Sequence, residues 1–384
     1  MSRATLVPIT PAVLGWAIRE SGYSPEEVAE RVGVSPDTLG SWLARTAQPD
    51  LTRFKKLVSV LKRPSATFLL PGPPTLVRPQ VEFRHPPDSG RTLLNPVEQR
   101  YLREASRLQR ALAWVLGELQ EEPTPLPRAV VGSDVERLGA ATRHLLGISD
   151  EQQLGWENSS QALGAWRLAL ENAAVVVLLL PLGKTSCRGF SLWDDRAPLI
   201  AVNTWWNNEA RTYTLFHEYA HLLSRTNSAC VEPSGPMRRQ AEDPERWCEG
   251  FAAAVLMPWN VVSDYLRSSL GWSPGKALTE LDAVRRVARR FKVSMRAAAI
   301  RLIERKIATW DLYREIPSWP DEKPPGGGGG GRQRHQIRLD AYGARTVRLF
   351  VRAVKREVLS RPDVTDYLDV GDLDLDKLEA AVNS

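Results

Sequence analysis

The stretch TLFHEYAHLL, residues 214–223, constrains the fold most, because it places two histidines and a glutamate within a largely apolar segment. In an α-helix, residues i and i+4 lie on one face, so His217 and His221 can present both imidazoles to one metal ion. Glu218 is rotated by about 100° from His217 on the helix, where a carboxylate can act on a metal-bound water. Two histidines satisfied on a helix surface are the simpler interpretation, but burial without a partner would be costly. The pattern therefore favours a zinc site with Glu218 as general base.

A catalytic zinc site takes three protein ligands and leaves the fourth position for water. The segment EDPERWCEGFAAAVLMP begins with acidic residues and continues as an apolar helical pattern. Glu245 and Glu249 are four residues apart and share one helix face, so spacing alone leaves both open as the third ligand. Glu232 and Glu242 are weaker candidates because they precede the helical pattern.

Three short segments rich in β-forming residues, at 174–181, 189–193 and 198–203, precede the histidine segment. Turn residues bound each of them, which predicts a small sheet. Together with the helical patterns around them, they indicate a mixed α and β domain over residues 129–320.

The N-terminal residues 24–61 carry the spacing of a helix-turn-helix. Ser24 and Ser35 are each followed by proline and are predicted N-caps, and Gly33 is predicted to end the first of the two helices. The second helix would enter the major groove of DNA, with candidate contacts from Ser35, Asp37, Thr38, Ser41 and Arg45. Nine basic and six acidic residues within 1–64 make the expected electrostatic attraction modest.

The rest of the chain is divided by proline and glycine. The proline-rich stretch at 69–79 should end the first helical unit, and Asn95 with Pro96 should open an amphipathic helix. Six consecutive glycines, Gly326–Gly331, predict a flexible tether. The basic segment 283–307 also has helix-turn-helix spacing, and we favour a structural role for it over a second DNA contact. The predicted domains are 1–73 (helix-turn-helix), 74–125 (linker), 126–320 (metallopeptidase-like), 321–334 (tether) and 335–384 (small helical unit).

Composition excludes some classes of protein. No stretch reaches the roughly 18 apolar residues of a spanning helix, and the N-terminus lacks a signal-peptide pattern, so we expect a cytoplasmic protein without a membrane partner. Cys187, Cys230 and Cys248 are few and scattered, which argues against a disulfide framework. A net charge of +6 permits nucleic acid as a partner without requiring it.

The segments TYTLFHEYAHLL and ERWCEGFAAAVLMP, preceded by GFSL and PLIAVN, resemble the ImmA/IrrE family of zinc metallopeptidases. The family's helices read FTLxHExxHLL and ExxANxFAxxLLMP, and the resemblance covers roughly residues 125–260. It implies zinc as cofactor, His217, His221 and Glu245 as its ligands and Glu218 as the base.

Two positions depart from the family pattern. Cys248 replaces an alanine, and Glu249 replaces an asparagine and puts an extra carboxylate beside Glu245. The N-terminal stretch resembles XRE-type repressors, in the version fused ahead of ImmA/IrrE peptidases. This likeness implies DNA as a partner.

The expected fold is multidomain and mainly α, with an all-α N-terminal domain, a zincin-like α+β domain and a small helical C-terminal unit. By resemblance, the protein would be a DNA-binding zinc endopeptidase that regulates transcription by cleaving a repressor-like or antitoxin-like protein. One alternative is a helix-turn-helix regulator or antitoxin-like protein with a structural or sensory zinc site. Another is a housekeeping peptidase. A glutamate directly after the first histidine favours the endopeptidase.

Overall fold

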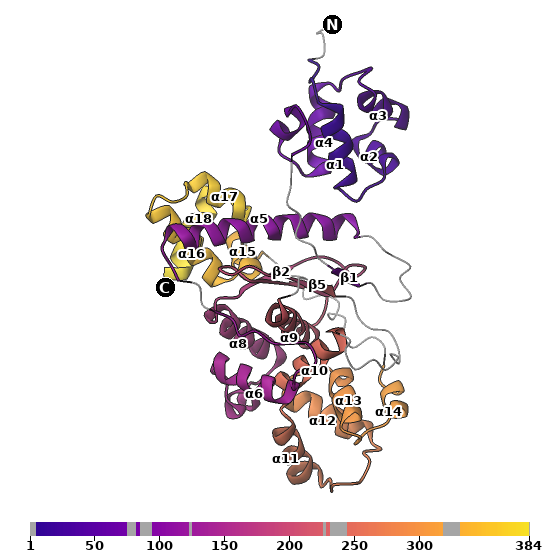
Figure 1. The fold of residues 1–384 in the computed structure, drawn as a ribbon, viewed down its shortest axis with the longest axis vertical. Helices are drawn as coiled ribbons and strands as arrows, with labels where there is room; N and C mark the ends of the chain where they lie inside the picture. The colour runs from indigo at the N-terminus through magenta and orange to yellow at the C-terminus, as the bar shows by residue number, and fades with distance from the viewer. Residues whose placement is uncertain are drawn as a thin grey trace. The chain divides into compact units, whose positions relative to one another are not determined.

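A computed structural model describes residues 5–74, 82–84, 94–122, 125–225, 228–230, 244–317 and 331–383. The chain forms two compact units, one of Met1–Phe83 with Gly90–Glu104 and the other of Arg84–Ser89 with Ala105–Ser384 (Figure 1). Among the described helices, none is both long enough and apolar enough to cross a membrane.

The first unit is a bundle of short helices whose ends follow the sequence signals. Ser24 caps α2 in a capping box with Glu27, and Ser35 accepts a hydrogen bond from the backbone N–H of Thr38. Gly33 ends α2 with φ of 80°, in the left-handed region that glycine favours. The predicted caps are therefore confirmed. The elements are α1 (Pro11–Arg19), α2 (Pro25–Val32), α3 (Pro36–Leu43), α4 (Leu51–Leu61) and the 3-10 helix η1 (Ser65–Leu69).

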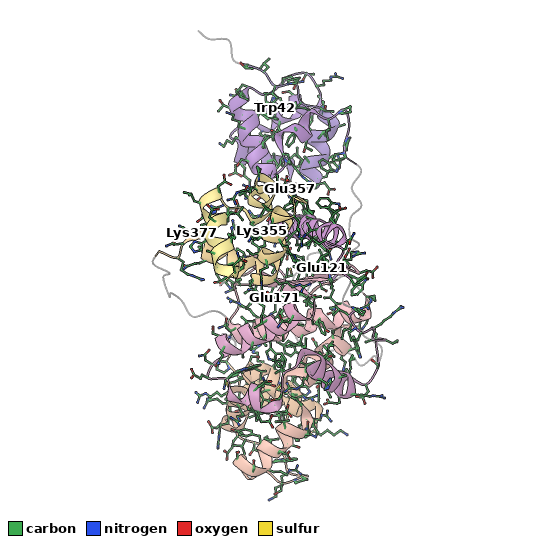
Figure 2. The ribbon with its side chains drawn as sticks, turned by 90° about the vertical axis from the view of Figure 1, so that its left-hand side faces the viewer. Trp42, Glu121, Glu171, Lys355, Glu357 and Lys377 are labelled. Atoms are coloured by element: carbon green, nitrogen blue, oxygen red, sulfur yellow. The ribbon has the colours of Figure 1, made fainter. Side chains whose placement is uncertain are left out.

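A small apolar core holds these helices together. Trp42 from α3 is 2% exposed and lies among Leu14, Val28, Leu39 and other buried side chains of the unit (Figure 2). Burial of apolar surface stabilises a fold by roughly 25 cal/mol per Å². The apolar residues whose spacing predicted a helix-turn-helix core thus form the core of this unit.

A sheet runs through the second unit. Its strands β2 (Val176–Leu180), β3 (Gly189–Leu192), β4 (Leu199–Asn203) and β5 (Ser228–Cys230) lie in the order β5, β3, β4, β2, and a short β1 (Glu82–Arg84) lies where the chain passes between the units. β2 runs parallel to β4, with Val176 opposite Leu199, and β3 is antiparallel to both β4 and β5. The three predicted strand segments are confirmed.

Helices cover both faces of this sheet (Figure 1). α8 (Ser159–Asn172) and α9 (Asn208–Ser224) lie on one face, and α9 packs in turn against α10 (Pro244–Leu256). On the other face lies the second half of α5 (Pro96–Glu118), where the side-chain amide of Gln109 donates to the carbonyl oxygens of Leu192 and Ala197. Further helices complete the unit: α6 (Val135–Leu146), α7 (Asp150–Gly155), α11 (Trp259–Leu270), α12 (Leu281–Phe291), α13 (Met295–Glu304) and α14 (Trp310–Arg314).

The basic segment 283–307 forms α12 and α13. Its apolar residues, among them Val287 and Phe291, belong to the main core of the second unit. Arg301 is only 2% exposed, donates to the carbonyl oxygen of Met257 and pairs with Glu136. This burial gives the segment a structural role, as the sequence favoured.

The C-terminal helices belong to the second unit. They are α15 (Arg334–Tyr342), α16 (Ala344–Lys355), α17 (Arg361–Leu368) and α18 (Asp372–Asn383). α15 packs against β2, the edge strand of the sheet. Arg167 of α8 donates to the carbonyl oxygens of Val177 in β2 and Asp340 in α15, so one guanidinium ties three elements together. Most of the predicted tether, residues 321–330, lies outside the described residues.

Gly343 lies close to Glu171, a residue labelled in Figure 2, and this approach offers a test of the packing of the C-terminal helices. Gly343 has φ of 83°, and a Cβ there would overlap the carboxylate of Glu171, which is buried and paired with Arg167. We expect Gly343→Ala to destabilise the second unit by about 1–3 kcal/mol, lowering its melting temperature by several degrees. Gly371→Ala is the control, because a Cβ there meets nothing within 4 Å. Equal melting temperatures for the two variants would contradict this packing.

Candidate metal centre

The histidine-bearing helix α9 lies at the centre of the second unit. Asn207 caps its N-terminus, and every residue from Thr214 to Leu223 is buried. Phe216 packs edge-to-face against Trp166 of α8, with ring centroids 4.8 Å apart. The buried helix that the sequence indicated is therefore present, and the polar side chains on it need partners.

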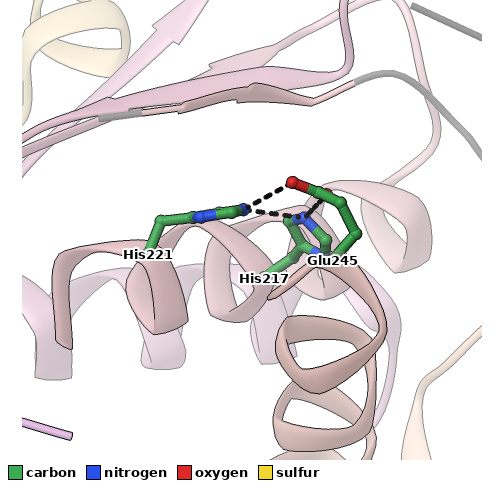
Figure 3. A group of neighbouring side chains, drawn as sticks. All are labelled: His217, His221 and Glu245. Carbon is green, nitrogen blue, oxygen red and sulfur yellow. Dashed lines mark hydrogen bonds and ion pairs between the residues drawn. The ribbon is translucent and has the colours of Figure 1, made fainter. Parts of the chain in front are cut away.

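His217, His221 and Glu245 supply those partners to one another (Figure 3). The Nε2 atoms of the two imidazoles are 3.3 Å apart. The Glu245 carboxylate, in the first turn of α10, places Oε2 3.2 Å from His217 Nε2 and Oε1 3.5 Å from His221 Nε2. Two adjacent turns of α9 and the first turn of α10 thus bring two imidazoles and one carboxylate together, with their ligand atoms within 4.8 Å of one another.

These distances fit a zinc ion. Zinc binds nitrogen and oxygen ligands at about 2.0–2.2 Å in a tetrahedron, which puts neighbouring ligand atoms about 3.3 Å apart. The two imidazole nitrogens, 3.3 Å apart, match that edge length, and they lie 3.2 and 3.5 Å from different oxygens of the Glu245 carboxylate. Two imidazole nitrogens and one carboxylate oxygen are also a donor set that zinc accepts, with the fourth corner left for water or substrate.

The electrostatics of the group follow from the placement of one carboxylate against two buried imidazoles. Burial alone would lower the pKa of His217, but its hydrogen bond to Glu245 and the nearby charge of Glu218 raise it overall. Burial alone would raise the pKa of Glu245, and its hydrogen bonds with His217 and His221 outweigh this and hold it far below its usual range. A metal ion binds neutral imidazoles, so its binding would displace protons from the group.

Of the two carboxylates that spacing left open, Glu245 groups with the histidines among the described residues, and Glu249 does not. The backbone carbonyl of Glu249 accepts a hydrogen bond of 3.0 Å from the hydroxyl of Tyr213, one turn before His217. Burial, followed by the charge of Glu249, raises the pKa of Tyr213 well above its ordinary value.

The sequence also singles out Glu232, Glu242 and Cys248. Glu232 and Glu242 lie outside the described residues. Cys248 is fully buried in the core of the second unit, so the larger side chain at this position is accommodated by packing.

Glu218 is fully buried on the side of α9 that faces the sheet. At Gly189, the first residue of β3, a Cβ would lie 3.4 Å from Cγ of Glu218 and 2.6 Å from Cγ2 of Thr214. Because glycine has no Cβ, the strand can pass this close to the helix turn that carries the carboxylate. Sequence reasoning missed Gly189; the only signal was a glycine opening a strand pattern.

Comparison with known families agrees with this architecture. Residues 170–303 match the family model of the IrrE N-terminal-like domain, a peptidase family, and residues 16–68 match a helix-turn-helix model. The chain therefore combines a helix-turn-helix domain with an IrrE N-terminal-like domain. No curated protein and no solved structure matches it.

The span that matches the IrrE N-terminal-like domain contains His217, His221 and Glu245, the candidate metal group. It includes β2 to β4, the histidine helix α9 and the glutamate helix α10, and it ends within α13. The resemblance read from the sequence, and the mainly helical fold with a small sheet, are confirmed.

The helix-turn-helix domain presents its candidate DNA contacts unequally. The hydroxyls of Ser35 and Thr38 lie 2.9 Å apart at the start of α3, and Ser41 donates to the carbonyl oxygen of Thr38. These three hydroxyls are thus engaged within the helix. Asp37 and Arg45 are exposed, and Arg45 is the cationic member of the five.

Proposed function

We propose that this protein is a cytoplasmic, zinc-dependent endopeptidase with its own DNA-binding domain, which regulates transcription by cleaving a repressor-like or antitoxin-like protein. The observation that carries the proposal is the convergence of His217, His221 and Glu245 in a domain that matches a peptidase family. Glu218, on the same helix, supplies a carboxylate beside that group.

In peptide hydrolysis, three residues would bind the metal and a fourth would transfer the proton. His217, His221 and Glu245 would hold the zinc ion. When bound, zinc is a Lewis acid that polarises a peptide carbonyl and lowers the pKa of a water molecule. Glu218 would take the proton from the attacking water as the new C–O bond forms, and would then return it to the leaving amine as the peptide C–N bond breaks. Enclosure of Glu218 beneath β3 keeps bulk water away from this proton.

The same enclosure favours a second candidate function. A base must reach the attacking water, and the side chain of Glu218 is 0% exposed. A regulator that binds zinc for structure or for sensing would have no need of an accessible carboxylate. The two functions differ in one observable, which is the appearance of newly cut peptide bonds.

The test is a comparison of cut proteins in cells. New protein N-termini would be profiled by mass spectrometry in cells that produce wild type and in cells that produce Glu218→Gln. We expect a small set of new N-termini in the wild-type cells alone, within a DNA-binding or antitoxin-like protein. Identical profiles would favour the regulator, and cuts in many unrelated proteins would indicate a housekeeping peptidase.

The DNA-binding part carries its own prediction. If Arg45 contacts a phosphate, Arg45→Ala should weaken DNA retention to a similar degree on all sequences and reduce the slope of log affinity against log salt by about 1. Filter retention over a series of salt concentrations measures both. Arg314→Ala, an exposed arginine of α14, is the control for lost charge. An unchanged salt slope would exclude a phosphate contact at Arg45.

A further inference from the structure

A cluster of three arginines, Arg63, Arg100 and Arg103, stands out in the first unit. Arg100 and Arg103, together with Lys62, the chain neighbour of Arg63, line a small hollow between the loop after α1, the end of α4 and the first turns of α5. The hollow measures about 60 Å³, which is room for a few water molecules or one small anion. Neither the metal group nor the candidate DNA contacts use these residues.

The guanidiniums of the cluster are short of acceptors. Nε and Nη2 of Arg63 and Nε of Arg100 are buried and donate no hydrogen bond to any described residue. Arg63 is stacked on the ring of Trp16 at 4.5 Å, which holds it in place without satisfying its N–H groups. Arg103 donates to the backbone carbonyl of Glu20.

The guanidinium of Arg103 is close enough to those of Arg63 and Arg100 to be repelled by them. Burial lowers its pKa to about 10, and the positive charges of Arg63 and Arg100 act in the same direction. The carboxylate of Glu104 acts against this shift; its Oε1 is 3.8 Å from Arg100 Nε, and its side chain is 58% exposed. Because that carboxylate is exposed to solvent, it offsets the charge of the guanidiniums only in part.

Simpler explanations cover only part of the cluster. A cation near the C-terminus of a helix is favourable, and Arg63 follows α4 directly, but this accounts for one arginine and not for three. A guanidinium stays protonated in proteins, so the cluster cannot relieve its repulsion by losing protons. An anion would relieve this repulsion, and the planar N–H forks of arginine suit the oxygens of phosphate. The N-terminus of α5, at Pro96 and Val97, also borders the hollow, and the side chains of Asn95 and Glu98 cap it.

We propose that Arg63, Arg100 and Arg103 form a binding site for a phosphate-class oxyanion in the first unit. The phosphate could belong to the DNA backbone or to a free phosphorylated molecule. The three arginines belong to the first unit and the metal group to the second. The proposal therefore does not depend on peptidase activity.

The test is calorimetric titration of inorganic phosphate into the full-length, zinc-loaded protein, against chloride of equal ionic strength. Wild type is compared with Arg63→Met and Arg103→Met, which keep an unbranched side chain and remove the charge. Arg314→Met, in the second unit, is the control for lost charge and for phosphate binding elsewhere. We expect the control to bind as wild type does and the two cluster variants to bind at least about tenfold more weakly.

DNA retention in the same proteins separates the two sources of phosphate. If phosphate competes with DNA and Arg63→Met weakens retention beyond the control, the occupant is a backbone phosphate. If phosphate binds and DNA retention is unaffected, the occupant is a free phosphorylated molecule. Because Arg103 also bonds to Glu20, Arg100→Met replaces it should Arg103→Met fail to fold. Equal phosphate titrations in wild type and cluster variants, together with unchanged DNA retention, would overturn the site.

Discussion

Replacing His217 with alanine should leave the purified protein without zinc, where wild type should hold about one ion per chain. The variant keeps one imidazole and one carboxylate, too few ligands to hold the ion through dialysis. Loss of even an outer partner of a ligand weakens metal sites by about 10–100-fold, so loss of a ligand should cost at least about 100-fold in affinity. Elemental analysis after dialysis, with a fluorescent zinc competitor, measures both quantities.

The choice between the two glutamates is settled by the same assay. Glu245→Ala removes a carboxylate that lies 3.2 Å from His217 Nε2 and should lower zinc affinity nearly as far as His217→Ala. Glu249→Ala is the matched control, because it makes the same chemical change one turn later on α10. The reverse order of the two variants would make Glu249 the ligand, and zinc retained in His217→Ala would show that the ligand set is wrong.

Zinc should also stabilise the second unit. A ligand that binds only the folded state adds stability of RT ln(1 + [L]/Kd), about 4 kcal/mol at a thousandfold excess over Kd. Chelation of wild type should therefore lower the melting temperature of this unit, and chelation of His217→Ala should not. A melting temperature of wild type that does not respond to chelator would mean that no ion is bound in the folded protein.

Local features of this chain could be predicted from its sequence. Ser24, Ser35 and Gly33 act through residues three or four positions away, so their roles as caps are visible in the sequence. The three β segments are equally local, because each is short, apolar and bounded by turns. The spacing of His217 and His221 fixes their common face on any helix.

Contacts between distant residues could not be predicted in the same way. Glu245 and Glu249 share a helix face, and only the angle at which α10 meets α9 decides which carboxylate reaches the histidines. Gly189 and Gly343 matter because of side chains that other elements bring against them. The helices α12 and α13 are a further example. Their sequence has helix-turn-helix spacing, which a DNA-binding helix pair and a purely structural one share, and only their buried face in the core distinguishes the two.

The exchange of Glu218 for glutamine should separate metal binding from catalysis. Glutamine has the shape of glutamate and cannot accept a proton at neutral pH, so the fold and the zinc content should stay near those of wild type. General base catalysis contributes about 10²–10⁴-fold to the rate of a reaction, and cleavage should fall by that factor. The rate is measured on a purified substrate found by N-terminal profiling, with zinc content determined on the same preparations.

Glu209→Gln is the control for this exchange, because Glu209 lies in the first turn of the same helix, away from the metal group. It should cleave as wild type does. Cleavage that survives in Glu218→Gln would remove Glu218 from the reaction and leave the proton to another group. If zinc content falls together with cleavage, Glu218 acts by supporting the site and not as a base. Because the carboxylate is enclosed between α9 and β3, the exchange also tests whether water reaches it: a base in contact with water should give a loss of rate with zinc retained.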